Sequence, residues 1–271
     1  MREVGIVGMG LIGGSLGLAL RRLEDRVHVT AVTRTEADAE AATARGAADR
    51  SGTQLEGLRD CELVVVATPI SQAARTFEQL GHVLPQATLI TDVASVKQPI
   101  LDLARRLPTP SRFLGGHPMA GKTERGLAHG EASLFVGTPW VFTPSEGQDP
   151  SPFGWWIDLV REIGAQPVLM SAREHDQRAA FVSHLAFTLS AAYAATVEAN
   201  GGQAMAGPGF RSMTRLAAGD PRLYVDIVAA NQGPLLQAID RFTETLARFR
   251  QRIAAQDQLA DLFAEADRAR A

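Results

Sequence analysis

The feature that most constrains the fold lies within the first fifteen residues, where a short apolar run ends in closely spaced glycines. The segment reads Val4-Gly5-Ile6-Val7-Gly8-Met9-Gly10-Leu11-Ile12-Gly13-Gly14-Ser15. We interpret it as a buried strand that turns at Gly8 into a helix, with Gly10 leaving room for a pyrophosphate and Gly13 letting the helix pack closely. Free amides at the start of a helix favour negative charge. The pattern predicts a dinucleotide site formed by Gly8, Gly10, Leu11, Ile12 and Gly13.

Composition narrows the class of protein. The chain has 271 residues, is 45% hydrophobic and carries a formal net charge of −3. This length allows one large domain or two ordinary ones, and the slight acidity argues against a nucleic-acid partner. No basic leader precedes the apolar N-terminus and no apolar run approaches the length of a membrane span, so we expect a cytoplasmic protein without a membrane partner. Cys61 is the single cysteine, which excludes an intramolecular disulfide and favours a packing role.

Short apolar runs separated by helix-like stretches fill the first two thirds of the chain. This alternation is typical of a parallel sheet that is covered by helices on both faces. The expected strands are 3–7, 27–32, 63–67, 88–92, 113–116, 139–143 and 166–170. Thr35 and Asp38 have the spacing of a helix N-cap and its partner, so a helix is expected to begin there.

From Ala172 onward, β-branched runs disappear, and alanine, leucine and charged residues take over with helical spacing. Helices are expected near 174–199, 210–218, 221–231 and 234–253, with a short polar helix at the end. The first of these is apolar nearly all round, which requires cover from neighbouring helices or from a second subunit. We therefore predict an α/β chain with a Rossmann-type, mostly parallel sheet domain over 1–171 and an all-helical domain over 172–271 that forms a homodimer.

The end of the second predicted strand bears on the choice of nicotinamide cofactor. A carboxylate about twenty residues past the glycines normally binds the adenosine ribose, but Thr33 stands there and Arg34 follows it. A missing acid and an adjacent guanidinium favour a 2′-phosphate, so NADP is favoured over NAD. The alternative is that Arg34 points to solvent and Thr33 binds the ribose. Thr68 and Pro69, which follow the strand at 63–67, are expected to contact the nicotinamide half, and no metal is expected.

A histidine lies at the predicted carboxyl edge of the same sheet. The strand at 113–116 leads to His117, which is followed by Pro118-Met119-Ala120-Gly121. Histidine suits proton transfer near neutrality, and hydride transfer from an alcohol requires a base for the hydroxyl proton. Because a dinucleotide fold accompanies it, we interpret His117 as the catalytic base. The alternative is a histidine that makes only structural hydrogen bonds.

With these motifs in place, the chain resembles the prephenate/arogenate dehydrogenase family of tyrosine biosynthesis. The resemblance spans nearly the whole chain, and its motifs come in the family's order. It rests on the glycine segment 8–15, on 91–97 (TDVASVK), on 115–121 (GGHPMAG), on Leu134-Phe135 with Thr143-Pro144, on 182–185 (VSHL), and on 209–217 (GFRSMTRLA) followed by Asp220-Pro221.

The resemblance implies an NAD(P)-dependent oxidoreductase that converts prephenate to 4-hydroxyphenylpyruvate by oxidative decarboxylation, or, as the alternative, arogenate to tyrosine. It implies that His117 accepts the proton of the ring hydroxyl, and that Ser95 hydrogen-bonds this hydroxyl and helps to orient His117. Arg215 matches the family's arginine for the substrate carboxylate. This arginine lies in the helical half, so the site is expected in the cleft between the domains.

Further substrate contacts are expected from Arg211, Lys122 and His184. The two cations could equally be solvated surface charges, and His184, on the long helix, either lines the pocket or makes a core hydrogen bond. Lys97, one turn past Ser95, either contacts substrate or cofactor or forms a structural salt bridge.

The chain departs from the family's pattern at several positions. Phe187 stands where many relatives have a second histidine, 122–125 reads Lys-Thr-Glu-Arg, and Ser212 stands where an aspartate is common. These positions bear on whether the substrate carries a keto group, as in prephenate, or an amino group, as in arogenate. No spare carboxylate is evident to pair with an ammonium, which favours prephenate, whereas the NADP-like second strand resembles relatives that use arogenate.

Two other kinds of protein are the alternatives to this interpretation. A hydroxyacid or 6-phosphogluconate type of dehydrogenase needs a lysine base on the long helix, and none lies between Glu174 and Ala199. The second alternative is not an enzyme but a non-catalytic sensor that binds a dinucleotide. It has no need of His117 with Ser95.

Overall fold

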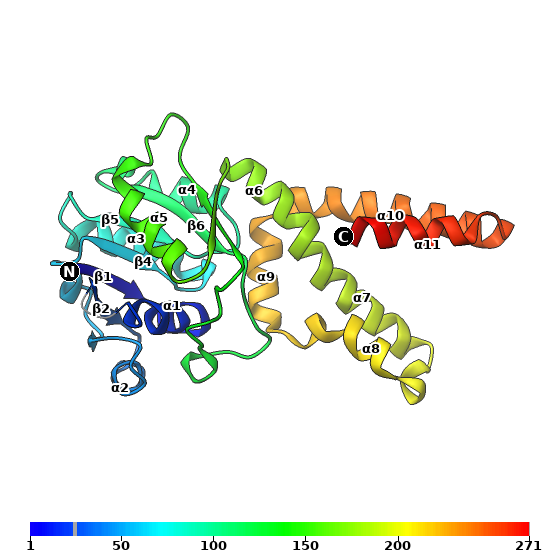
Figure 1. Ribbon diagram of the computed structural model, residues 1–271, viewed down its shortest axis with the longest axis horizontal. Coiled ribbons are helices and arrows are strands. Elements are labelled where there is room, and N and C mark those ends of the chain that lie inside the picture. The colour runs from blue at the N-terminus through cyan, green and yellow to red at the C-terminus, as the bar shows by residue number, and fades with distance from the viewer. Residues whose placement is uncertain (24–25, 271) are drawn as a thin grey trace.

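The computed structural model describes residues 1–23 and 26–270, and one mixed sheet organises the N-terminal part of the chain (Figure 1). Eight described strands lie in the order β3-β2-β1-β4-β5-β6-β7-β8. Their bounds are β1 Arg2–Val7, β2 Val27–Val32, β3 Arg50–Gly52, β4 Leu63–Val66, β5 Leu89–Asp92, β6 Phe113–Pro118, β7 Pro139–Thr143 and β8 Gln166–Leu169. Neighbouring strands are parallel except β6 and β7. The carboxyl ends of β1, β2, β4 and β5 therefore share one edge, where ligands of such sheets bind.

Helices cover both faces of this sheet. They are α1 Leu11–Arg21, α2 Glu36–Ala44, α3 Ile70–Val83, α4 Gln98–Ala104 and α5 Gly154–Glu162. Side chains of β4 alternate between the faces, so that Leu63 and Val65 pack with α1 and α5 while Val64 and Val66 pack with α3 and α4. Cys61 is buried on the face of the sheet that α3 and α4 cover, and burial raises the pKa of its thiol to about 12. It has the environment of a packing residue.

The sequence predictions for the sheet domain are confirmed, with two differences. All seven expected strands form, and the Thr35 hydroxyl accepts a hydrogen bond from the Asp38 amide at 3.1 Å as the N-cap of α2. The short edge strand β3 was not predicted because Arg50, Ser51 and Gly52 form no apolar run, and the strand depends on its pairing with β2 and on the hydrogen bond from the Ser51 hydroxyl to the Ala39 carbonyl of α2. Strand β6 continues beyond the predicted end to Pro118. It leaves β5 after Leu114 and pairs with β7 from Gly115 onward, which places His117 inside a strand.

The C-terminal part of the chain is helical, as expected. Its elements are α6 Ala172–Ala179, a π-helical turn Ala180–His184, α7 Leu185–Ala199, α8 Pro208–Met213, α9 Pro221–Ala230, α10 Gln232–Ala255 and α11 Leu259–Arg270. The Ser171 hydroxyl caps α6 by accepting from the Glu174 amide. Helices α6 and α9 contact α4 and α3 of the sheet domain, while α7, α10 and α11 extend away from it (Figure 1).

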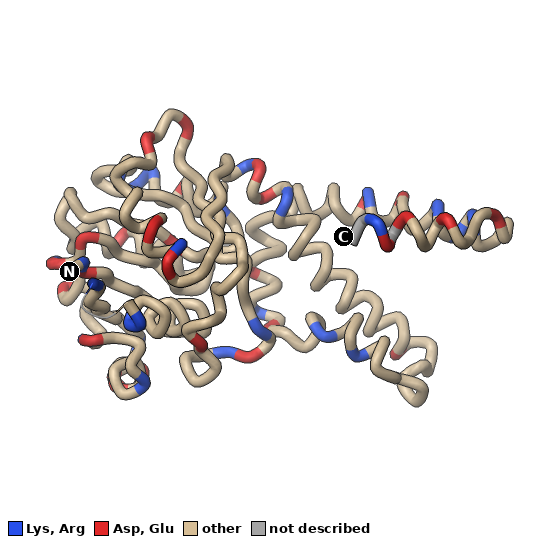
Figure 2. Tube along the Cα trace, in the orientation of Figure 1, with Lys and Arg blue, Asp and Glu red and all other residues tan. Residues whose placement is uncertain are grey.

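The long helical segment 172–199 is only partly covered by the rest of its own chain. Figure 2 shows α7 almost free of charged residues, and Phe181, Val182 and Tyr193 are exposed. By length and composition alone the segment could cross a membrane, so the expectation that no apolar run approaches that length was wrong. Helices in the core of water-soluble proteins pass the same test. The exposure of Phe181, Val182 and Tyr193 shows that neighbouring helices of the same chain leave much of this apolar surface uncovered.

Candidate active site

The glycine turn between β1 and α1 forms the cradle expected for a pyrophosphate. Gly8 has a φ of +97°, and a Cβ there would lie 2.8 Å from the carbonyl oxygen of Ala67. A Cβ on Gly13 would overlap the carbonyl oxygen of Gly8. A Cβ on Gly10 would meet no atom of the described chain within 4 Å. The first and third glycines are thus required by the turn itself, and the second leaves open space beside Leu11 and Ile12 for a ligand to approach.

The residues expected to hold the two ends of the dinucleotide lie at the same sheet edge. Thr33 follows β2, and its buried hydroxyl donates to the Thr35 carbonyl at 2.9 Å. Arg34 is exposed and forms no ion pair with any described residue. Thr68 follows β4, and its buried hydroxyl has no hydrogen-bond partner in the described part of the chain. Pro69 is exposed at the start of α3. The open cradle and the unpaired Thr68 hydroxyl both fit a nicotinamide dinucleotide bound along this edge.

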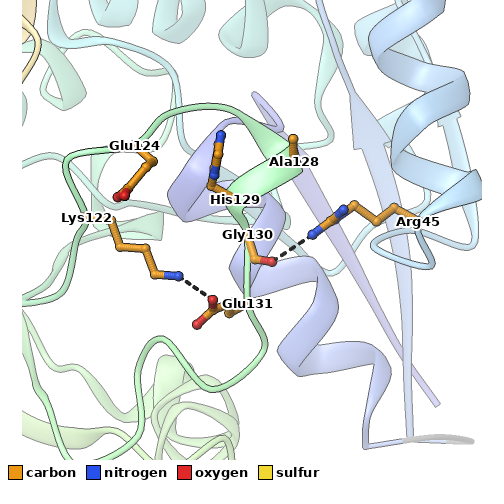
Figure 3. A pocket seen from close by; sticks show the side chains of 7 residues that line it. All are labelled: Arg45, Lys122, Glu124, Ala128, His129, Gly130 and Glu131. Carbon is orange, nitrogen blue, oxygen red and sulfur yellow. Dashed lines mark hydrogen bonds and ion pairs between the residues drawn. The ribbon is translucent and has the colours of Figure 1, made fainter.

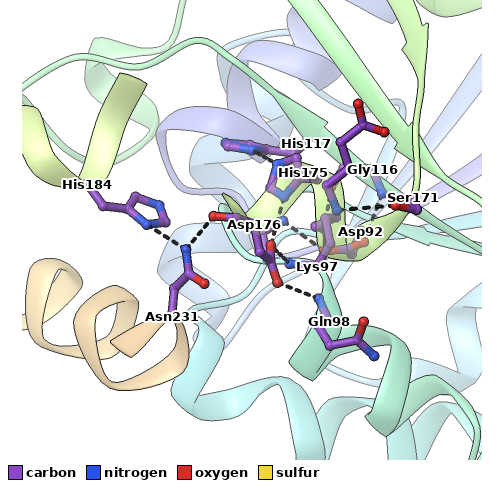
Figure 4. A network of polar contacts seen from close by, with 12 residues as sticks. Asp92, Lys97, Gln98, Gly116, His117, Ser171, His175, Asp176, His184 and Asn231 are labelled. Atoms are coloured by element: carbon purple, nitrogen blue, oxygen red, sulfur yellow. Dashed lines mark hydrogen bonds and ion pairs between the residues drawn. The ribbon is translucent and has the colours of Figure 1, made fainter. Parts of the chain in front are cut away.

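His117 is joined to the helical domain by a chain of hydrogen bonds (Figure 4). Its Nδ1 lies 2.8 Å from Nε2 of His175, and Nδ1 of His175 lies 2.8 Å from Oδ1 of Asp176. Asp176 also accepts hydrogen bonds from the backbone amides of Lys97 at 2.7 Å and Gln98 at 2.8 Å. His117 comes from β6, whereas His175 and Asp176 come from α6. The chain of contacts therefore crosses from one domain to the other.

The environment of His117 favours the neutral ring. Burial lowers its pKa well below the ordinary value, and the nearby His175, Lys97 and His184 lower it further. The residue as a whole has a relative exposure of 8%. Since a neutral imidazole can accept a proton and a cationic one cannot, the ring is in the protonation state that a base requires at neutral pH.

A buried ion pair fixes the strand that carries His117. The Lys97 ammonium pairs with the Asp92 carboxylate and donates to the Gly116 carbonyl at 2.6 Å. The other oxygen of Asp92 accepts from the Gly116 amide at 3.0 Å. Both charges are buried, and Lys97 is fully so. Of the two alternatives open for Lys97, the structural salt bridge is the one found.

His184 lies beside this network, at the end of the π-helical turn. Asn231 donates from Nδ2 to the Asp176 carbonyl at 2.8 Å and contacts Nδ1 of His184 at 3.0 Å. Burial lowers the pKa of His184 to about 4, while Asp176 and a backbone contact with Ser95 act in the opposite direction. His184 thus makes the expected core hydrogen bond and also lies near the loop that carries Ser95. Its Nε2 is buried without a well-formed partner among the described residues.

Arg215 is connected to the histidines through a row of rings. It is exposed, forms no ion pair within the described part of the chain, and lies near enough to Tyr224 to oppose the rise that burial produces in the pKa of this phenol. Tyr224 stacks on Phe187 with ring centroids 4.2 Å apart, and the rings of Phe187 and His184 are 6.0 Å apart. His184 in turn is close enough to lower the pKa of His117. The stacked rings of Tyr224 and Phe187 and the nearby ring of His184 thus lie between the region of Arg215 and that of His117.

The other two expected cations make different contacts. Arg211 is exposed and donates to the Ala206 carbonyl at 3.1 Å. Lys122 pairs with Glu131 at 2.5 Å, at a hollow of about 420 Å³ that is also lined by Arg45 and His129 (Figure 3). No contact within the described residues links either cation to His117.

Family models for two domains account for most of the chain. The prephenate dehydrogenase nucleotide-binding domain matches residues 16–169, and the prephenate dehydrogenase dimerization domain matches residues 171–265. The chain belongs to the prephenate dehydrogenase family. Within it, the prephenate dehydrogenase of Bacillus subtilis (strain 168) is 30% identical over 260 residues, which make up 93% of this chain and 70% of that protein.

Solved structures of the family have the same fold. The Synechocystis arogenate dehydrogenase is 32% identical with a TM-score of 0.83, over 99% of this chain and 98% of that one. The Aquifex aeolicus prephenate dehydrogenase, in complex with hydroxyphenyl propionate and NAD+, is 26% identical with a TM-score of 0.88, over 100% and 97%. These relatives confirm the Rossmann-type fold and the family resemblance, and they make this prephenate dehydrogenase family member an NAD(P)-dependent oxidoreductase.

Sequence reasoning missed three polar residues of this family member's site. His175 and Asp176 of α6 and Asn231, which lies between α9 and α10, are almost fully buried. The only signal in the sequence was that His175 and Asp176 are adjacent and follow the N-cap residue Ser171. This signal does not reveal that His175 contacts His117, 58 positions earlier in the chain. Among the described residues, no three histidine, cysteine or acidic side chains gather in a way that could hold a metal ion.

Proposed function

We propose that the chain is a prephenate dehydrogenase that oxidises and decarboxylates prephenate to 4-hydroxyphenylpyruvate. The observation that carries this proposal is the buried His117, whose pKa is lowered by burial, at the sheet edge that also holds the dinucleotide cradle. The bound dinucleotide supplies the hydride acceptor. The chain's own residues supply the base, the hydrogen bonds that orient it and the positive charge that a dianionic substrate requires.

His117 takes the proton from the ring hydroxyl as hydride leaves the same carbon. Ser95, whose side chain has no described hydrogen-bond partner, donates to or accepts from this hydroxyl. The carbon–carboxylate bond then breaks, its electron pair enters the ring, and carbon dioxide leaves. The ring oxygen recovers a proton from His117, so the base returns to its starting state. Arg215 pairs with a carboxylate of the substrate.

The carboxylates of the network favour prephenate over arogenate. Asp92 is paired with Lys97, and Asp176 is fully occupied by His175 and two backbone amides. Neither is free to bind an ammonium group. Arogenate is the second candidate, since the Synechocystis relative of similar length is an arogenate dehydrogenase.

We also propose NADP as the preferred cofactor and a homodimer as the assembly. The exposed Arg34, with no carboxylate at Thr33, supports a 2′-phosphate. The uncovered apolar surface of α7 and the matching dimerization-domain family support a second copy as its cover.

The test is turnover of the purified protein with prephenate or arogenate and with NADP+ or NAD+, followed at the absorbance of the reduced nicotinamide. We expect prephenate with NADP+ to give the highest kcat/KM. No turnover with either substrate would remove the assignment. Faster turnover of arogenate would transfer it to the second candidate.

A further inference from the structure

We propose that His175 and Asp176 form a positioning pair that holds His117 in one tautomer, with its Nε2 free to accept the substrate proton. The inference deepens the proposed function, because it explains how the helical domain prepares a base that belongs to the sheet domain. Neither residue has been placed in contact with substrate or cofactor, so they act through His117.

The direction of each hydrogen bond follows from Asp176. A carboxylate can only accept, and this one already receives the amides of Lys97 and Gln98. The Nδ1 of His175, at 2.8 Å, must therefore carry a hydrogen and donate it. In a neutral ring Nε2 of His175 then has only its lone pair. The contact at 2.8 Å is satisfied if His117 donates from Nδ1, and this leaves Nε2 of His117 without a hydrogen.

Burial makes this arrangement hard to replace by water. The relative exposures are 8% for His117, 2% for His175 and 4% for Asp176. A ring that lost its partner here would keep an unpaired polar atom inside the protein, which is costly. The hydrogen-bond chain therefore selects one tautomer of His117 before any substrate binds.

The Asp176 carboxylate offsets part of the cost of the positive charge that His117 gains on proton transfer. When Nε2 accepts the hydroxyl proton, the ring becomes a cation in a place where burial disfavours that charge, as do its neighbours His175, Lys97 and His184. Its Nδ1–H still points to His175, whose own Nδ1–H points to the Asp176 carboxylate. The anionic charge of Asp176, held by two backbone amides, thus faces the developing positive charge through one intervening ring. The proton itself goes from substrate oxygen to Nε2 and later returns.

Because α6 carries both members of the pair, the base is prepared only when the helical domain is docked on the sheet. The amides that bind Asp176 belong to the sheet domain at the start of α4. One carboxylate therefore both contributes to the docking of α6 and orients the catalytic ring.

The first experiment measures the tautomer without substrate, by 15N NMR of histidine-labelled protein near neutral pH. The chain has six histidines, and His117→Asn and His175→Gln assign the two signals. We expect Nδ1 of His117 to be protonated and Nε2 to be bare. An Nε2–H tautomer in the wild-type protein would overturn the inference, whether or not the proposed substrate is turned over.

The second experiment separates positioning from simple structural support. His175→Leu removes the acceptor, whereas His175→Gln offers its amide oxygen near the position of Nε2. We expect kcat to fall about 100-fold in the leucine variant with KM and NADP binding within about twofold, and the glutamine variant to recover at least about tenfold. The exposed His82→Leu is the matched control and should leave kcat unchanged.

Equal losses in the leucine and glutamine variants, or an unchanged kcat in the leucine variant, would contradict the positioning role. If the leucine variant does not fold, the glutamine variant and the wild-type tautomer still decide. A wild-type protein that turns over neither substrate defeats the proposed function alone, because the NMR measurement needs no substrate.

Discussion

The ammonium of Lys97 and the carboxylate of Asp92 form an ion pair from which solvent is excluded, and both groups hydrogen-bond to Gly116 in the strand that carries His117. Removing one partner of such a pair leaves an uncompensated buried charge, which costs more than the pair itself contributes. Lys97→Met should therefore lower the free energy of unfolding by about 3–5 kcal/mol, as measured by urea denaturation.

Two further variants test whether burial is the reason. The double variant Lys97→Met with Asp92→Asn removes both charges and should recover part of the loss. Arg105→Met breaks the exposed pair with Asp102 and should cost about 0.5 kcal/mol or less. Equal losses from the buried and exposed substitutions would show that Lys97 is not a structural charge.

The glycine turn gives a prediction that separates folding from cofactor binding. Gly13→Ala forces a Cβ into the Gly8 carbonyl and should lower the melting temperature by several degrees. Gly10→Ala points into open space and should leave the melting temperature nearly unchanged while weakening NADP binding about tenfold or more. Thermal unfolding and cofactor titration of both variants check this. A Gly10→Ala protein that binds NADP normally would place the pyrophosphate elsewhere.

Cofactor choice is predicted to depend on Arg34. Loss of a charge-assisted contact with the 2′-phosphate in Arg34→Ala should weaken NADP binding about tenfold and leave NAD binding unchanged. Thr33→Asp should shift the preference toward NAD by repelling the phosphate. Fluorescence titration gives the dissociation constants, with exposed Arg106→Ala as the control. If Arg34→Ala weakens the binding of both cofactors equally, or of neither, then Arg34 does not bind the 2′-phosphate.

The low pKa of His184 should make the free energy of unfolding depend on pH. Its pKa in the folded protein, about 4, lies below the ordinary value of 6.5, so the unfolded chain takes up the proton first as the pH falls. The stability that the neutral ring contributes is therefore present above pH 6.5 and is lost between pH 6.5 and 4, at up to about 1.4 kcal/mol per pH unit. His184→Asn keeps an acceptor for Asn231 and does not titrate, so its unfolding free energy should fall less steeply over this range. Parallel curves would contradict the assignment.

Much of the fold could be predicted because it depends on local patterns. The turn at Gly8 follows from backbone sterics, and the strands follow from apolar runs such as Leu63–Val66. Strand β3 could not be predicted in the same way, since Arg50, Ser51 and Gly52 form no apolar run and depend on contacts with β2 and α2. His117 was predicted as the base from its place beside glycines after the strand expected at 113–116, and the structure extends this strand through His117.

The rest of the site depends on contacts that sequence spacing does not reveal. Whether Lys97 binds a ligand or a carboxylate was open until its burial beside Asp92 was known. His175 and Asp176 have no distinctive motif, and their contacts with His117 and with the start of α4 arise only when α6 packs against the sheet domain. The same holds for Lys122, whose partner Glu131 lies in a loop without regular spacing.

His117 and Arg215, which come from different domains, are expected to act on one substrate in different ways. Steady-state kinetics of His117→Asn and Arg215→Gln with prephenate and a saturating cofactor measure this most directly. We predict that His117→Asn lowers kcat about 100-fold or more with little change in KM, and that Arg215→Gln chiefly raises KM. The reverse pattern, or full activity in either variant, would contradict the account.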